Sequence, residues 1–243
     1  MRATTSGGPP SVIATVGLHG SASTWAFNVV RELIASACGE AAILPLFADE
    51  LAQLPPDDAR TDRYVVIKSH RGSVELDAWL AAEGAHIVLS VRDPRDACIS
   101  MCQRFRLNLN RAAAAVAADC RRLARLATLG HKLLRYEDRP FDHIGAVETL
   151  AADLGVSPGA AMLSEIFERY RTDAVRAFAA RLTELPADRL TATGGFAMDQ
   201  VTQILAPHIG DAATGKWRRL PPKVAEDLTH FFGPFLDDFG YAR

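Results

Sequence analysis

The sequence predicts a single α/β domain with a central parallel β-sheet flanked by helices. Short, nearly continuous apolar runs alternate with helical stretches over the first two-thirds of the chain. Such runs are typical of strands that are buried on both faces of a parallel sheet. The 243 residues suit one well-cored domain, and no repeat or convincing linker divides them.

The elements are expected in the following order. Residues 1–10 are rich in Gly, Pro and Ser, so we expect a flexible lead there and a domain over 11–243. The first strand is expected at Ser11–Gly17, followed by the small-residue loop LHGSASTW and a helix that ends near Gly39. The other strands are expected at Tyr64–Lys68, His86–Val91 and Lys132–Tyr136, and the other helices at Ser73–Ala82, Arg95–Phe105, Arg111–Leu129 and roughly Asp142–Leu154.

The last third of the chain has weaker patterns. Residues 157–207 indicate irregular helical structure with no clear strand. The C-terminal segment FFGPFLDDFGYAR indicates a terminal helix or turn that docks aromatic side chains onto the core.

Composition excludes several classes of function. The formal net charge is -2, with 27 basic and 29 acidic residues, so a general attraction to nucleic acid has no support. No apolar run approaches the roughly 20 residues of a membrane span, and the N-terminus lacks an apolar signal region. The four cysteines have no metal-binding spacing. We therefore expect a cytoplasmic protein.

The loop LHGSASTW is a candidate phosphate-binding loop. It lies between a predicted strand and a predicted helix, where unpaired backbone N–H groups and the helix dipole attract anions. A serine-rich turn without a ligand explains the loop equally well. The Walker A pattern of nucleotide kinases is absent, and its near miss at Gly210–Trp217 has Trp217 at the place of the metal-binding hydroxyl.

Four further segments carry candidate functional residues. VVIKSH ends a strand with Lys68 and His70, which lie two residues apart and so face the same way. In VLSVRDPRDACIS, Arg92 follows a strand and Ser100 lies in the next helix. LLRYED contains Tyr136, and TGKWRRL is a basic and aromatic cluster near the C-terminus.

In order and spacing, these five segments resemble the PAPS-dependent sulfotransferase family of the cytosolic or bacterial type, from Val12 to Trp217. The resemblance implies a sulfotransferase that moves a sulfuryl group from 3′-phosphoadenylyl sulfate (PAPS) to a hydroxyl-type acceptor, leaving PAP. It implies a P-loop-like loop for the 5′-phosphosulfate and no metal. The acceptor is left open among a small molecule, a glycan and a lipid, and a homodimer is one option for the oligomeric state.

The resemblance also assigns roles by position. It implies His70 as the general base and Lys68 as a charge-stabilising residue. It implies Arg92 and Ser100 at the 3′-phosphate and Trp25 and Tyr136 beside the adenine. The remaining nucleotide contacts fall on Gly20, Ser21, Ala22, Ser23, Thr24, Gly215, Lys216, Trp217 and Arg218.

Three departures from the family pattern leave alternatives open. The family's loop lysine falls on Gly20, so His19 or Lys68 is expected to replace it. The family's RKG tripeptide is absent, with His208, Ile209 and Gly210 nearby, and its dimerisation motif is not recognisable. The alternative functions are a P-loop-like nucleotide kinase and a non-catalytic PAP- or PAPS-binding module.

Overall fold

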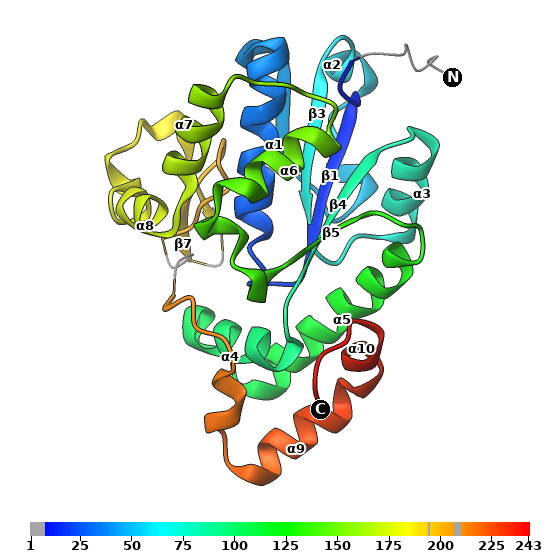
Figure 1. Cartoon of the computed structure of the whole chain (residues 1–243), viewed down its shortest axis with the longest axis vertical. Helices are drawn as coiled ribbons and strands as arrows, with labels where there is room; N and C mark the ends of the chain where they lie inside the picture. The colour runs from blue at the N-terminus through cyan, green and yellow to red at the C-terminus, as the bar shows by residue number, and fades with distance from the viewer. Residues whose placement is uncertain (1–7, 194, 207–209) are drawn as a thin grey trace.

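A five-stranded, wholly parallel sheet forms the centre of the computed structural model, which describes residues 8–193, 195–206 and 210–243. The strand order is β2-β3-β1-β4-β5. The strands are β1 (Val12–Gly17), β2 (Ile43–Phe47), β3 (Tyr64–Ser69), β4 (His86–Val91) and β5 (Lys132–Arg135). The predicted fold class, one α/β domain with a parallel sheet between helices, is confirmed (Figure 1).

The described residues also contain ten α-helices and seven short 3-10 helices. The α-helices are α1 (Ser23–Cys38), α2 (Asp57–Arg60), α3 (Val74–Ala82), α4 (Pro94–Phe105), α5 (Leu109–Ala127), α6 (Ile144–Asp153), α7 (Ala160–Tyr170), α8 (Thr172–Ala180), α9 (Pro222–Phe231) and α10 (Gly233–Asp238). The 3-10 helices are η1 (Glu40–Ala42), η2 (Leu51–Gln53), η3 (Tyr136–Asp138), η4 (Pro140–Asp142), η5 (Leu182–Glu184), η6 (Ala187–Arg189) and η7 (Lys216–Arg219).

The sheet separates two apolar cores because alternate residues of each strand face opposite sides. In β1, Ile13 joins a core with α1, α6, α7 and α8. Its neighbours Val12 and Ala14 join the other core, with α3, α4, α5, α9 and α10. Both faces are therefore covered, which explains the continuous apolar runs in the sequence.

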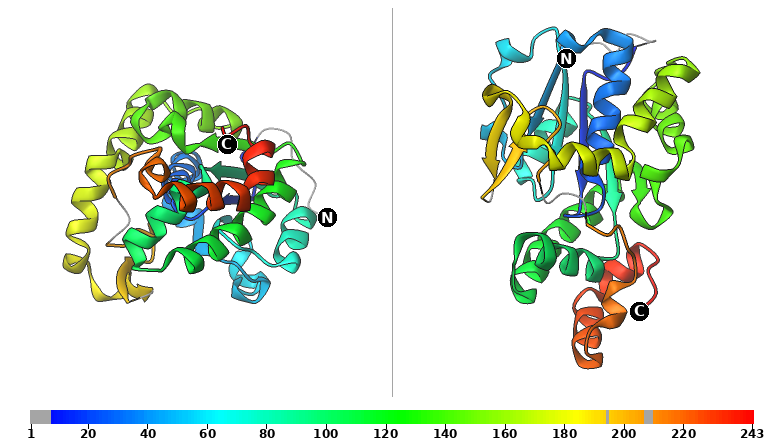
Figure 2. Two further views of the ribbon diagram at one scale, coloured as in Figure 1. Left: turned by 90° about the horizontal axis from the view of Figure 1, so that it is seen from below. Right: turned by 90° about the vertical axis from the view of Figure 1, so that its left-hand side faces the viewer.

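The carboxyl ends of the strands all lie at the lower end of the sheet in Figure 1. Because β1 pairs with both β3 and β4, the loop after β1 lies between the residues that follow those two strands. Helices α4, α5, α9 and α10 extend below this edge, as Figure 2 shows from below and from the side. In open parallel sheets, ligands bind at this edge, at the point where the strand order reverses.

Most predicted elements of the first two-thirds are confirmed, and each lies within about two residues of its expected position. The helix α1 ends at Cys38, and Gly39 follows with a φ of 85° and donates its N–H to Ala35 O. The C-terminal aromatics dock as expected, since Phe232, Phe235 and Phe239 are buried. Residues 1–7 lie outside the described residues, so the flexible lead at 1–10 stays a prediction.

Two predictions need correction. The prediction missed the edge strand β2, which contains Pro45. The prediction of no strand in 157–207 was wrong, because β6 (Leu190–Thr193) and β7 (Phe196–Asp199) form an antiparallel hairpin. A further bridge joins Met198 to Leu205 and extends this pairing. Within the described ranges, no helix is both long enough and apolar enough to span a bilayer.

Candidate functional site

The loop after β1 presents the N-terminus of α1 to the cavity. Ala22 precedes the helix in a left-handed conformation, with φ 67° and ψ 21°, and its side chain makes no cap hydrogen bond. The N-cap side chain therefore supplies no acceptor to the first N–H groups of α1. Such a helix end, with Ser23 and Thr24 in its first turn, is suited to an anionic oxygen.

Ser21 lies behind this loop, away from the cavity. Its N–H and its hydroxyl both donate to Leu18 O, at 3.1 and 2.8 Å, and the hydroxyl also lies 2.8 Å from Ser90 Oγ. These bonds fix the turn and use its polar groups. The structure therefore places Ser21 as a support of the loop.

His70 follows β3 and is held by hydrogen bonds of its backbone and of its ring. Its backbone N–H donates to Asp49 Oδ1 at 2.7 Å, and its Nδ1 lies 2.7 Å from Gly17 O. A carbonyl oxygen only accepts, so Nδ1 carries the hydrogen and Nε2 is the basic nitrogen of the neutral ring. The imidazole is thus held in the tautomer that a general base at Nε2 requires.

His19 stacks on His70, with ring centroids 4.1 Å apart and planes 20° apart. The buried carboxylate of Asp119, from α5, accepts from the backbone N–H of His19 at 2.9 Å and lies 2.6 Å from its Nδ1. One nitrogen of each ring and a carboxylate oxygen of Asp119 lie within 4.8 Å of one another. These three groups form a compact polar cluster beside the loop.

Lys68 comes two residues before His70, and its side chain is 5% exposed. The pKa of Lys68 is lowered to about 7, mainly by burial and then by the positive charge of Arg104, while Asp49 acts in the opposite direction. A buried cation with a neighbour of the same sign is stable when an anion binds close to it. Lys68 is therefore a candidate contact for a phosphate or sulfate group.

Arg92 follows β4 and links the loop after β1 to the segment at Ala213. Its Nη1 donates to Gly20 O at 3.0 Å and its Nη2 donates to Ala213 O at 2.7 Å. Its guanidinium carbon lies 4.0 Å from the ring centroid of Tyr136, and burial raises the pKa of that tyrosine. The buried Nε of Arg92 has no hydrogen-bond partner among the described residues. The guanidinium has five N–H donors and the two bonds to Gly20 and Ala213 use two of them, so the Nη groups can also donate to an anion.

The segment after Gly210 packs along α4. Asp96 accepts from the N–H groups of Gly215 and Trp217, at 2.5 and 3.0 Å. Two guanidinium carbons lie close to the Trp217 ring centroid, that of Arg95 at 3.6 Å and that of Arg218 at 4.6 Å. No strand precedes this segment within 210–214. It therefore lacks the strand–loop–helix arrangement of a Walker A loop.

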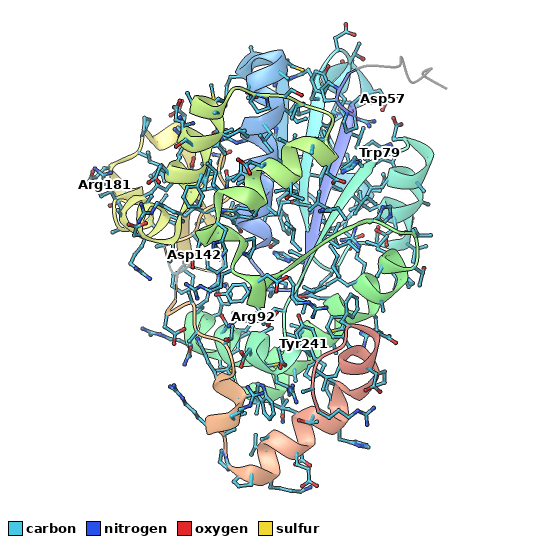
Figure 3. All side chains as sticks on the ribbon, in the orientation of Figure 1. Asp57, Trp79, Arg92, Asp142, Arg181 and Tyr241 are labelled. Carbon is cyan, nitrogen blue, oxygen red and sulfur yellow. The ribbon has the colours of Figure 1, made fainter. Side chains whose placement is uncertain are left out.

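A cavity of about 520 Å³ joins most of these groups. Figure 3 shows Arg92 at the lower end of the sheet, far from Asp57 at the opposite end. Of the sequence-predicted residues, twelve line the cavity: His19, Gly20, Ala22, Ser23, Thr24, Trp25, Lys68, His70, Arg92, Ser100, Tyr136 and Lys216. The other four, Ser21, Gly215, Trp217 and Arg218, do not line it. His208 and Ile209 lie outside the described residues.

Three polar residues of the site were missed at the level of the sequence. Arg104 lines the cavity, Asp119 binds His19, and Asp49 binds the backbone of His70. The position of Arg104, one helical turn after Ser100, was an available signal, because residues four apart share a helix face. A single acid among alanines on a buried helix face, as at Asp119, was a second signal.

Comparison with solved structures gives matches over nearly the whole chain. Mouse sulfotransferase SULT7A1 complexed with PAP matches with a TM-score of 0.64 at 13% identity, covering 98% of this chain and 91% of that one. Retinol dehydratase in complex with androsterone and the inactive cofactor PAP matches with a TM-score of 0.62 at 14% identity, covering 95% and 82%. Its complex with retinol and PAP gives a TM-score of 0.59.

No protein-family model matches the sequence, and no curated protein sequence matches it significantly. The similarity is therefore a similarity of fold, since the sequence identities are only 13% and 14%. The chain has the fold of these sulfotransferases.

Proposed function

We propose that this chain, which has the cytosolic sulfotransferase fold, is a PAPS-dependent sulfotransferase acting on a hydroxyl-type acceptor. The observation that carries the proposal is the meeting of Lys68, His70 and Arg92 with the N-terminus of α1 in one cavity. Structural neighbours with the same fold were crystallised with PAP. The cavity also has the cations and the helix N-terminus that suit a bisphosphorylated adenosine.

The donor fits the polar side of the cavity. PAPS supplies an activated sulfuryl group on a 5′-phosphate. The N-terminus of α1, with Ser23 and Thr24, would hold the phosphosulfate. Arg92, with its buried and unpartnered Nε, and Ser100 would hold the 3′-phosphate. Trp25 and Tyr136 would flank the adenine.

His70 would act as the general base. Its Nε2, made basic by the Nδ1 contact with Gly17 O, would take the proton of the acceptor hydroxyl as that oxygen attacks sulfur. Lys68, in its protonated form, would stabilise the charge that develops around the transferred group. Asp119 would hold His19 in place, so that His19 supports the His70 ring by stacking and adds a polar group to the cavity wall.

Much of the remaining cavity lining is apolar and favours an apolar acceptor. This apolar side includes Met101, Phe105, Leu107, Met198 and Leu205, and Phe47 lies beside His70 with ring centroids 6.1 Å apart. Neighbours with this fold were crystallised with androsterone or retinol, which are small apolar molecules. We therefore propose a small apolar alcohol or phenol as the acceptor, ahead of a glycan or a lipid head group.

Calorimetry with PAP and 5′-AMP is the first test. We expect PAP to bind more tightly than 5′-AMP, with the same affinity in EDTA and in magnesium. Arg92→Ala should remove most of the preference for PAP, a loss of about tenfold to a hundredfold for one charged contact. Arg121→Gln removes a charge from the exposed face of α5 and serves as the control. Undetectable PAP binding by folded protein would sink the proposal.

Transfer of labelled sulfate from PAPS to a panel of apolar alcohols and phenols is the second test. Transfer to at least one of them is expected. A non-catalytic PAP- or PAPS-binding module is an alternative, because glycine occupies position 20 of the loop and supplies no cation. PAP binding without transfer to any acceptor, glycans included, would favour that alternative. Magnesium-dependent turnover of ATP would favour the kinase.

A further inference from the structure

The loop at Gly20 has no cation of its own, but a guanidinium reaches it from α4. A Cβ placed at Gly20 would lie 3.7 Å from Arg104 Nη1 and 3.3 Å from Ser100 Oγ. Gly20 has a φ of 80°, which also favours glycine. A side chain at position 20 would therefore begin next to two groups of α4, the Ser100 hydroxyl and the Arg104 guanidinium.

Arg104 belongs to a cluster of three cations around the cavity. Desolvation lowers the pKa of Arg104 to about 10, and the charge of Arg92 contributes to the decrease. The charge of Arg104 in turn helps to lower the pKa of Lys68. Groups that disfavour each other's charge in this way are stabilised together by a ligand with several negative charges.

We propose that Arg104 is a catalytic residue of sulfuryl transfer, placed to donate hydrogen bonds to the oxygen that bridges sulfur and phosphorus. This inference rests on the proposed function. The acceptor oxygen forms a bond to sulfur, and the bond between sulfur and the bridging oxygen breaks. The bridging oxygen keeps the electron pair and leaves within PAP, and His70 takes the acceptor proton. Negative charge thus develops on the atom that faces Gly20 and the helix N-terminus.

Arg104 suits this task better than the two alternatives. The Nδ1 of His19 is directed to Asp119, 2.6 Å away. Lys68, with a pKa of about 7, is largely uncharged above neutral pH before a ligand binds. A guanidinium remains charged at those pH values and offers two parallel donors to phosphate oxygens. The cation missing from the loop is therefore supplied one helical turn after Ser100.

Kinetics of Arg104→Gln test the proposal directly. At saturating PAPS we expect kcat to fall by about a hundredfold to a thousandfold, the usual size for a lost donor to a developing anion. Arg104→Lys should recover part of this loss, and Arg121→Gln should match the wild type. Circular dichroism and thermal melting verify that each variant folds. A kcat within threefold of the wild type in folded Arg104→Gln would overturn the proposal.

Binding separates a role at the leaving oxygen from a role at the 3′-phosphate. Arg104→Gln should keep the preference for PAP over 5′-AMP, whereas Arg92→Ala should lose it. A loss of that preference in Arg104→Gln, as large as in Arg92→Ala, would show a 3′-phosphate contact and overturn the proposal.

A third measurement does not depend on activity, so it stays informative if the proposed function fails. The chain has four lysines, so NMR of lysine-labelled protein can resolve Lys68, with Lys68→Arg for assignment. Arg104→Gln should raise the pKa of Lys68, since a like charge is removed while Asp49 stays. An unchanged pKa would mean that Arg104 does not face the same anion site, and would overturn the proposal.

Discussion

The two sides of the cavity are built in different ways. On the polar side, loops and helix starts after β1, β3 and β4 are tied together by hydrogen bonds that side chains donate to backbone carbonyl oxygens, such as His70 to Gly17 O and Arg92 to Gly20 O. On the apolar side, side chains come from separate segments: Phe105, Met198 and Leu205. The pairing register of the sheet fixes the polar side, whereas the packing of connecting segments fixes the apolar side.

This difference indicates that the polar and apolar sides of the cavity have different functions. Strand register keeps the donor groups in place to within a fraction of an ångström, which catalysis requires. The apolar side can change its shape without disturbing that register, because the β6–β7 hairpin lies outside the central sheet. We therefore expect substitutions on the two sides to change different kinetic quantities.

The largest effect is expected for His70→Ala on the polar side. Loss of a general base should lower kcat by at least about a hundredfold, while PAP affinity stays within threefold. Transfer of labelled sulfate and calorimetry measure the two quantities. His230→Ala, at an exposed position of α9, is the matched control. Full activity in His70→Ala would break the comparison, because the strand-end histidine would then take no part in the chemistry.

A smaller effect is expected for Phe105→Ala on the apolar side. Phe105 ends α4 and meets the Phe196 ring of β7 at a centroid distance of 6.2 Å. Removing this contact should lower kcat/KM for an apolar acceptor by roughly tenfold, as for other hydrophobic pockets. PAP affinity should stay within twofold, and exposed Phe231→Ala should change neither quantity. An equal loss of PAP affinity would show that the two sides are not separable.

The residues at the strand ends and those in connecting segments also differ in how well the sequence predicts them. The strands β1, β3 and β4 and the residues after them were predictable, because burial on both faces leaves long apolar runs with polar residues at their ends. Lys68, His70 and Arg92 then meet because parallel strands end at one edge. Their contacts follow from topology more than from local propensity.

The parts that the sequence did not predict lie at edges and in connections. The strand β2 contains Pro45, which is tolerated at a sheet edge but weakens a strand pattern. The hairpin has only four residues in each strand, and its Gly194–Gly195 dipeptide was the available turn signal. Asp119 binds a residue 100 positions away, and no local pattern encodes such a pair.

The smallest effect concerns the stability of the polar side. Ala22 is left-handed, a conformation that costs an L-residue about 1 kcal/mol relative to glycine. Ala22→Gly should therefore raise the free energy of unfolding by roughly 0.5 kcal/mol, since the more flexible unfolded chain offsets part of the gain. Urea denaturation measures it. Ala114→Gly, at an exposed position inside α5, should instead lower the value by about 1 kcal/mol.

PAP affinity of the Ala22→Gly variant shows what the strained alanine does. The N–H groups after position 22 point to the proposed phosphosulfate site, and their direction depends on the conformation of this residue. A glycine adopts the same conformation more easily but also leaves it more easily. If PAP affinity stays within twofold, hydrogen bonds around Ser21 hold the loop. A loss beyond fivefold would mean that the alanine itself keeps the loop in place and that the polar side depends on local stiffness as well as on strand register.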